Sequence, residues 1–409
     1  MRLPASLRGL PRETFVLALV AFCVALGFGI VVPAVPLFAL QFGVGTTAAG
    51  AVVSAFALMR LVSGLAGGRL VDRVGERSAL MVGLGVVAVS SLLAGLAVSY
   101  PQLLVLRAVG GIGSAVFTIA ATSLLLRVAS AAQRGQTQSV YRGGFLLGGI
   151  IGPAFGGAVI GISLRAPFFL YAGTLGLAML VAATMLPRSP VPDQPAQVTL
   201  GVAEEDAAPH VVVPEPRTTL RTALASPAYR AALAGNFAVG FSVLGVRSTV
   251  VPLLVVQDLH LAAGWIGAAF VVAALVQAVL LLPAGRAVDQ IGRRPTLLAG
   301  GFVTAASLVG LALVSGPATL LLAMAVFACG AAVLGVAPAA IVGDVVRGKG
   351  GTAVAVWQMS SDLGSVIGPL AAGFLIDHGS FGTALAVSAA VVAACTLPGL
   401  RIAARTVAA

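Results

Sequence analysis

Charged side chains that interrupt long apolar stretches are the residues of this sequence best suited to chemistry. Arg60, Arg107, Arg142, Arg247 and Asp362 all stand within such stretches. An ionisable group in hydrocarbon is costly and is a functional hypothesis by default. Asp362 is the one carboxylate near the middle of an apolar stretch, so it could take up and release a proton. The alternative for each residue is a structural ion pair or, for the arginines, a side chain that extends to the membrane surface.

The composition indicates the environment of these residues. The chain has 409 residues, of which 59% are hydrophobic and 9% are charged, whereas soluble domains carry about 25% charged residues. The sequence therefore predicts a polytopic membrane protein. The net charge of +11 comes from dispersed basic residues, which does not indicate a nucleic-acid partner. The sequence has no nucleotide loop, nucleophile–base motif or metal-ligand spacing, so we expect no enzyme, cofactor or metal site.

Apolar runs long enough to cross a bilayer dominate the chain. A helix needs about 20 apolar residues to span ~30 Å of hydrocarbon, and the runs lack the period-two alternation of a barrel strand. We predict an all-α fold of twelve transmembrane helices, at 14–40, 47–68, 78–99, 101–127, 136–161, 166–186, 229–256, 262–285, 295–315, 317–343, 352–377 and 381–400.

These runs form two groups of six. We predict an N-terminal half at 1–186, a Pro-rich linker at 187–228 and a C-terminal half at 229–409. Basic residues outside the runs lie almost entirely on one side, with Arg165 as the exception. This bias predicts a multi-pass protein of the cell membrane, inner or plasma, with both termini and the linker in the cytoplasm.

The two halves read as copies of each other. The turn at 67–77, which contains Asp72, returns at 284–294 with Asp289. Glycine–proline segments in the fifth and eleventh runs share one register, and their predicted helix-packing residues are Gly148, Gly152, Pro153, Gly156, Gly364, Gly368 and Pro369. Duplicated halves of one topology imply a pseudo-two-fold axis along the membrane normal. That architecture suits alternating access to a substrate site between the halves, near the midplane.

With these features the chain resembles the major facilitator superfamily over nearly its whole length. The turn after the second helix resembles that family's loop signature in Gly68, Asp72, Arg73, Gly75 and Arg77, although Glu76 stands where a basic residue is usual. Leu103, Arg107, Gly111 and Gly113 resemble its fourth-helix arginine signature, with Gly110 where glutamine is common. The glycine–proline segment of the fifth helix resembles that of twelve-helix drug/proton antiporter-like exporters, with Ser139 in place of its upstream glycine.

The resemblance implies a cytoplasmic gate between the halves. In the family the loop aspartate, here Asp72, lies against the start of the eleventh helix, where a carboxylate is favourable. A second element pairs a base with an acid: the second half keeps it as Arg293 and Asp344, and a charge-reversed Glu76–Arg127 pair could replace it in the first half. The predicted gate residues are Gly68, Asp72, Arg73, Gly75, Arg77, Gly285, Asp289, Gly292, Arg293 and Asp344.

The resemblance also implies which residues face the substrate. Helices two and eleven meet between the halves, so Arg60 and Asp362 are predicted partners, and with Arg107 they are the candidates for proton coupling. The candidate cavity residues are Phe28, Arg107, Phe117, Asn236, Phe241, Arg247, Met324, Phe327 and Gln358. An excess of arginine over carboxylate makes the cavity electropositive, which disfavours cations and tolerates anions or neutral amphiphiles.

The sequence therefore predicts a proton-coupled exporter, or antiporter, of small hydrophobic or anionic compounds. The expected partners are a small-molecule substrate, protons and the lipid bilayer, and we expect a functional monomer. One alternative is an uptake symporter of the same fold, because glycine-rich packing also serves purely mechanical rocking. Another is a membrane sensor or scaffold that transports nothing, which would call for a signalling domain that the sequence does not contain.

Overall fold

The computed structural model describes residues 10–129, 133–187, 218–346 and 351–402, apart from the side chains of residues 65–69, 72, 134, 135 and 154. Within these ranges every regular element is a helix, and twelve candidate membrane spans are present. The predicted all-α fold of twelve transmembrane helices is confirmed. The linker and the proposed boundaries at residues 187 and 228 stay predictions, because residues 188–217 lie outside the described part.

The first six spans form the N-terminal group. They are α1 (Arg12–Val31) with α2 (Ala34–Leu40), α3 (Thr46–Val74), α4 (Glu76–Gly95), α5 (Tyr100–Val128), α6 (Arg134–Ile160) and α7 (Ala166–Met185). The C-terminal group begins with the short α8 (Leu220–Ala225). Its six spans are α9 (Pro227–Val239) continued by η2 (Gly240–Val246), α10 (Arg247–Leu253) and η3 (Leu254–Asp258), then α11 (Gly264–Gln290), α12 (Arg293–Ala312), α13 (Pro317–Val345), α14 (Gly351–Asp377) and α15 (Phe381–Thr396) with η4 (Leu397–Arg401).

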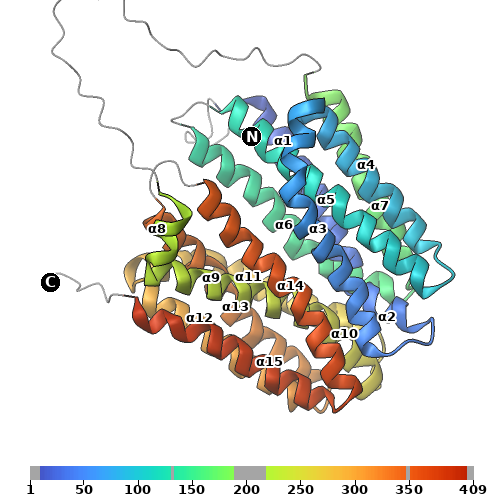
Figure 1. The fold of residues 1–409 in the computed structure, drawn as a ribbon. Helices are drawn as coiled ribbons and strands as arrows, with labels where there is room; N and C mark the ends of the chain where they lie inside the picture. The colour runs from blue at the N-terminus through green and yellow to red at the C-terminus, as the bar shows by residue number, and fades with distance from the viewer. Residues whose placement is uncertain (1–9, 130–132, 188–217, 347–350, 403–409) are drawn as a thin grey trace, which may run out of the picture.

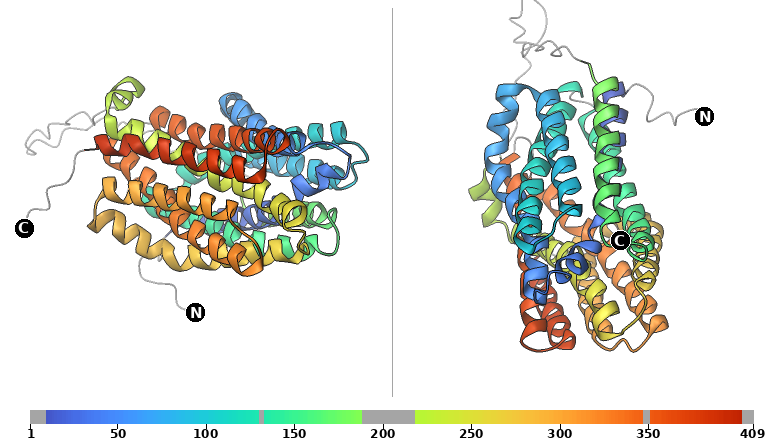
Figure 2. Two further views of the ribbon diagram at one scale, coloured as in Figure 1. Left: turned by 90° about the horizontal axis from the view of Figure 1, so that it is seen from below. Right: turned by 90° about the vertical axis from the view of Figure 1, so that its right-hand side faces the viewer.

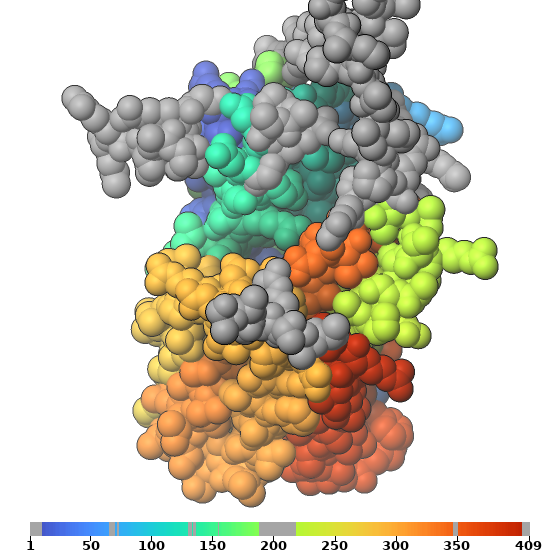
Figure 3. Space-filling model, turned by 90° about the vertical axis from the view of Figure 1, so that its left-hand side faces the viewer, coloured from blue at the N-terminus to red at the C-terminus, as the bar shows by residue number. Residues whose placement is uncertain are grey.

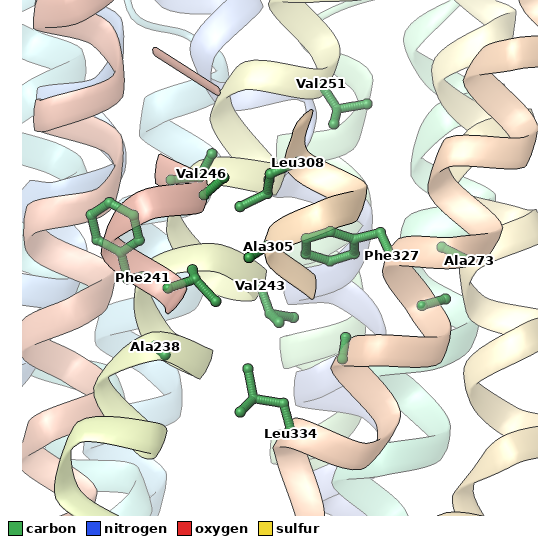
Figure 4. Close-up of a cluster of buried hydrophobic side chains, with 14 of the residues drawn as sticks. Ala238, Phe241, Val243, Val246, Val251, Ala273, Ala305, Leu308, Phe327 and Leu334 are labelled. Atoms are coloured by element: carbon green, nitrogen blue, oxygen red, sulfur yellow. The ribbon is translucent and has the colours of Figure 1, made fainter. Parts of the chain in front are cut away.

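The two groups are bundles that pack against each other (Figures 1 and 2). Each has its own buried apolar core, and Figure 4 shows Phe241, Leu308 and Phe327 within the core of the C-terminal group. The end of α7 and the start of α8 lie at one end of the molecule, which we call the linker end; the opposite end is the far end (Figure 1). Figure 3 views the molecule from the left of Figure 1, with both groups in sight.

The duplicated turn has the same backbone conformation in both groups. Gly75 separates α3 from α4 with φ of 79°, and Gly292 separates α11 from α12 with φ of 109°. A side chain is strained at such positive φ angles, so glycine is the favoured residue at both turns. Gly75 and Gly292 thus hold matching places in the two copies of the turn, because the backbone at both places has a positive φ angle.

The glycine–proline segments mediate close helix packing within each group. A Cβ atom added at Gly148, Gly152 or Gly156 of α6 would collide with carbonyl oxygens of α1. Likewise, a Cβ at Gly364 or Gly368 of α14 would crowd carbonyl oxygens of α9 and η2. Small residues allow the backbones of two helices to touch. The van der Waals contacts made there stabilise helix packing in a membrane, where the hydrophobic effect does not drive helices together.

Candidate functional site

A cavity of about 330 Å³ lies between the two groups. Residues of α1, α3, α5, α6 and α7 form one side, and residues of η2, α10, α11 and α14 form the other. Most of the wall is apolar, and its aromatic members are Phe28, Phe56, Phe117, Phe145, Tyr171 and Phe270. Three arginines also line it, namely Arg60, Arg107 and Arg247. An apolar cavity with a few polar groups is typical of a small-molecule site.

Arg60 and Asp362 form a salt bridge that joins α3 to α14 across the two groups. The pairing predicted from the sequence is therefore confirmed. Their side chains are 35% and 17% exposed, so the pair is partly desolvated beside the cavity. Because the two residues belong to different groups, any rocking of one group on the other acts directly on this pair.

Arg107 on α5 has a different environment. It is 3% exposed, and its guanidinium carbon lies 4.6 Å from the centre of the Phe56 ring. Its Nε atom is buried without a hydrogen-bond partner, and no ion pair is formed with the described residues. The side chain is thus held by an aromatic ring, a favourable cation–π contact, rather than by an acid.

Arg247 is the matching residue of the C-terminal group. Its guanidinium carbon lies 5.4 Å from the centre of the Phe270 ring and 5.6 Å from that of Phe327. Its Nε atom is also buried without a hydrogen-bond partner in the described structure. Both groups therefore present to one cavity an arginine that is stacked on aromatic rings and has no carboxylate partner among the described residues.

The position of Arg247 depends on an irregular helix. Residues Gly240–Val246 form the π-helical segment η2 directly before it, and a second such segment follows at Leu254–Asp258. An i→i+5 turn contains more residues than an α-turn, so it rotates all later side chains about the helix axis. The apolar pattern of the sequence does not reveal this rotation, which changes the direction in which the Arg247 side chain points.

The structure brings some of the predicted cavity residues together and separates others. Phe28, Arg107, Phe117 and Arg247 line the cavity, whereas five others lie elsewhere: Asn236, Phe241, Met324, Phe327 and Gln358. Phe241, Met324 and Phe327 are buried in the core of the C-terminal group. The amide of Asn236 donates to the carbonyl oxygen of Trp357 at 2.6 Å, and Gln358 is exposed away from the lining. Helical spacing alone does not separate a core face from a cavity face.

The structure describes the ion pairs of the predicted gate at the linker end. The Arg293 guanidinium donates to Asp344 at 2.9 Å and to Asp289 at 2.6 Å, so the pairing expected in the second half is confirmed. In the first half Glu76 and Arg127 form the charge-reversed pair.

Other gate residues lie within their own groups or outside the described part. Arg77 donates to the carbonyl oxygen of Ala183 at the end of α7, and Arg73 and Gly75 are exposed. Gly285 of α11 is half-buried and has nothing near its Cβ position. The side chain of Asp72 and the surroundings of Gly68 lie outside the described part of the structure, so the predicted contact with α14 stays a prediction.

The sequence reasoning missed a polar contact at the far end. The Asp377 carboxylate, at the end of α14, accepts hydrogen bonds from the backbone and hydroxyl of both Thr46 and Thr47 at the start of α3. Midway towards the cavity, Ser54 donates to the carbonyl oxygen of Val366 at 2.6 Å. Together with Arg60–Asp362, these contacts join α3 to α14 from the far end to the middle of the molecule.

A second approach of the two groups lies at the far end between α6 and α11. A Cβ atom at Gly267 would come within 2.8 Å of the Gly157 backbone, so the two helices are in backbone contact there. With the α3–α14 contacts, this packs the two groups tightly at the far end. No group of potential metal ligands occurs among the described residues.

Comparison with known proteins agrees with this architecture. The family model of the Major Facilitator Superfamily matches residues 17–246 and 232–407. The quinolone resistance protein NorA of Staphylococcus aureus (strain MRSA252) is 28% identical over 183 residues, which are 44% of this chain and 46% of NorA. Multidrug resistance protein 2 of Bacillus subtilis (strain 168) is 28% identical over 165 residues, 40% of this chain and 41% of that protein. The chain thus matches less than half the length of these relatives.

Solved structures share the fold over nearly the whole chain. A bacterial homologue of the human lysosomal transporter Spinster, in an inward-facing and unoccupied conformation, matches with a TM-score of 0.69 and 15% identity, covering 95% of this chain and 94% of that one. The nucleoside transporter NupG matches with a TM-score of 0.69 and 14% identity, covering 95% and 98%. At these identities the likeness concerns the fold alone. From the family match over both groups, this chain is a multi-pass membrane protein that belongs to the Major Facilitator Superfamily.

Proposed function

We propose that the protein exports small hydrophobic or anionic compounds from the cytoplasm in exchange for protons, by alternating access of the cavity between the two groups. The observation that carries this proposal is the cavity itself, lined from both groups and bordered by the Arg60–Asp362 pair. A site shared by both groups changes its exposure when the groups rock. The partial matches to quinolone and multidrug resistance proteins favour export as the direction.

The linker end is cytoplasmic in this proposal, as the distribution of basic residues in the sequence indicates. The tight packing at the far end then corresponds to a state closed towards the outside. Cargo would enter from the linker end, and the far-end contacts between α3 and α14 would have to separate before release. The same-group pairs Arg293–Asp344 and Glu76–Arg127 would hold the helix ends of each group together during this motion.

Asp362 carries the coupling in this scheme. As a carboxylate it holds Arg60 and so links α3 to α14. When Asp362 takes up a proton, this charge-assisted contact weakens and the two groups can separate at this point. Proton uptake and release would therefore bias the equilibrium between the two states of the transporter, which is what coupling requires. No other described residue brings a carboxylate to this point of contact between the groups.

Transport by purified protein in proteoliposomes tests the proposal. An imposed pH gradient is combined with a panel of neutral, anionic and cationic aromatic compounds, with protein-free liposomes as the control for passive distribution. Exchange for protons predicts that cargo accumulates in an acidic lumen. Accumulation in an alkaline lumen would instead indicate a symporter, the alternative that the fold also allows. Absence of flux for every compound would contradict both.

A further inference from the structure

The charges around the cavity are unbalanced, and this imbalance indicates what the cavity binds. We propose that it takes a small aromatic anion whose carboxylate or sulfonate is held between Arg107 of the N-terminal group and Arg247 of the C-terminal group. This inference rests on the proposed function, since the same cavity would carry the cargo, and it narrows the cargo from hydrophobic or anionic compounds to aromatic anions.

The first argument is the charge count. Of the three arginines that line the cavity, only Arg60 has a carboxylate partner, Asp362, among the described residues. Among the described residues the lining contains no carboxylate that could neutralise Arg107 and Arg247. A buried charge is unfavourable unless it is paired and hydrogen-bonded. An anion that enters the cavity supplies the missing charge, while a cation would meet repulsion from both sides.

The second argument is the way in which the two guanidinium groups are held. Arg107 packs on the ring of Phe56, and Arg247 packs on the rings of Phe270 and Phe327, with 4.6–5.6 Å between guanidinium carbon and ring centre. The Nε atoms of both arginines have no hydrogen-bond partner in the described structure. The rings fix the side chains without using their N–H groups. Guanidinium N–H groups match the two oxygens of a carboxylate or sulfonate. Both arginines are therefore oriented by apolar contacts and free to bind an anion.

The third argument concerns the rest of the ligand. Phe28, Phe117, Phe145 and Tyr171 also line the cavity, so a flat aromatic body would contact rings on several sides. The volume of about 330 Å³ lies at the lower end of the range for small-molecule sites. A molecule of one or two fused rings that carries an acid group fits this volume better than a long one.

Binding to the purified protein in lipid nanodiscs tests the inference without relying on transport. The probes are naphthalene-2-carboxylate, the neutral naphthalene-2-carboxamide and the cationic naphthalen-2-ylmethylammonium, measured by titration calorimetry. The carboxylate should bind roughly 10-fold or more tightly than the carboxamide, since hydrogen bonds to charged groups are the stronger ones, and the ammonium compound should bind most weakly.

Variants identify the residues that are responsible. Arg107→Gln and Arg247→Gln should each weaken carboxylate binding by roughly 10-fold or more while leaving carboxamide binding nearly unchanged. Arg142→Gln is the matched control, because Arg142 is exposed on α6 and does not line the cavity. Arg247→Lys keeps the charge but loses the forked donors, so it should retain part of the preference and shows whether the site remains folded.

The inference is overturned if the carboxamide or the ammonium compound binds as tightly as the carboxylate, if both glutamine variants keep the preference, or if none of the three probes binds. Its failure is distinguishable from that of the proposed function. Arginine-dependent binding of the carboxylate without any flux would leave the anion site in place and contradict transport. Flux of neutral or cationic compounds without preference for the anion would leave export in place and contradict the anion site.

Discussion

Replacing Asp377 with Asn should open the far end of the molecule. The carboxylate accepts hydrogen bonds from Thr46 N at 2.8 Å and Thr46 Oγ1 at 2.6 Å, and from Thr47 N and Oγ1 at the same two distances. These donors lie at the first turn of α3, where a negative charge is also favoured by the helix dipole. Asparagine keeps the shape of the side chain, but its amide nitrogen donates and cannot accept.

The size of the effect follows from what the substitution removes. Asp377→Asn loses about two of the four hydrogen bonds, each worth about 0.5 kcal/mol at this exposed site, the low end of the usual range. It also loses the charge at the helix terminus, worth about 0.3–1 kcal/mol. The sum is about 1.3–2 kcal/mol, which would change the ratio of closed to open far ends by roughly 10- to 30-fold.

Distances between spin labels measure this ratio. Labels at Ser99 and Ser315, two exposed loop residues in different groups, would be placed in protein whose three cysteines have been replaced. The Asp377→Asn variant should gain a population with a longer distance, and Asp258→Asn, an exposed carboxylate on η3, should not. An unchanged distance distribution in Asp377→Asn would refute the view that this contact holds the far end closed.

Two further substitutions test the packing and pairing within the N-terminal group. Gly152→Ala should destabilise the protein by about 1–3 kcal/mol, because the added Cβ would collide with the α1 backbone. Gly149→Ala is the control and should not destabilise the protein, because the space around its Cβ position is open. Equal melting temperatures of the two variants in detergent would contradict this expectation. Glu76→Arg should cost about 1 kcal/mol by placing two guanidinium groups together, and adding Arg127→Glu should restore most of it. Failure of the double variant to recover its melting temperature would show that the pair contributes nothing.

Much of the fold follows from the sequence because lipid imposes few solutions. Apolar runs of spanning length must be helices, so the number and approximate bounds of the spans could be read directly. The pairs Arg60–Asp362, Glu76–Arg127 and Arg293–Asp344 were also predictable. In each case the resemblance to a known family supplied the neighbouring helices, and the charges then had few possible partners.

The cavity wall was harder to predict. In a helix buried on several sides, such as α13, Met324 and Phe327 have the same apolar character whether they face the core or a cavity. The π-helical segment η2 rotates Arg247 in a way that no sequence period reveals. The Asp377 contact joins residues about 330 positions apart, and only the antiparallel packing of α3 and α14 brings them together.

The Asp377 contact at the far end resembles the contact that is predicted for Asp72 at the linker end. Asp377 ends α14 and binds the start of α3, while Asp72, near the end of α3, is predicted to approach the start of α14. The same two helices would thus be capped reciprocally by an aspartate, one at each end of the molecule. In alternating access only one of the two caps would be formed at a time, and Asp362 lies between them on α14.

The central claim is that protons drive transport through Asp362, and one comparison tests it most directly. Wild-type protein and Asp362→Asn are reconstituted at equal density, and cargo accumulation is measured under a pH difference of one unit, which is worth about 1.4 kcal/mol for each proton. The account predicts that the wild type accumulates cargo about 10-fold per coupled proton, and that Asp362→Asn equilibrates cargo without accumulating it. Equal accumulation by the variant would contradict the account.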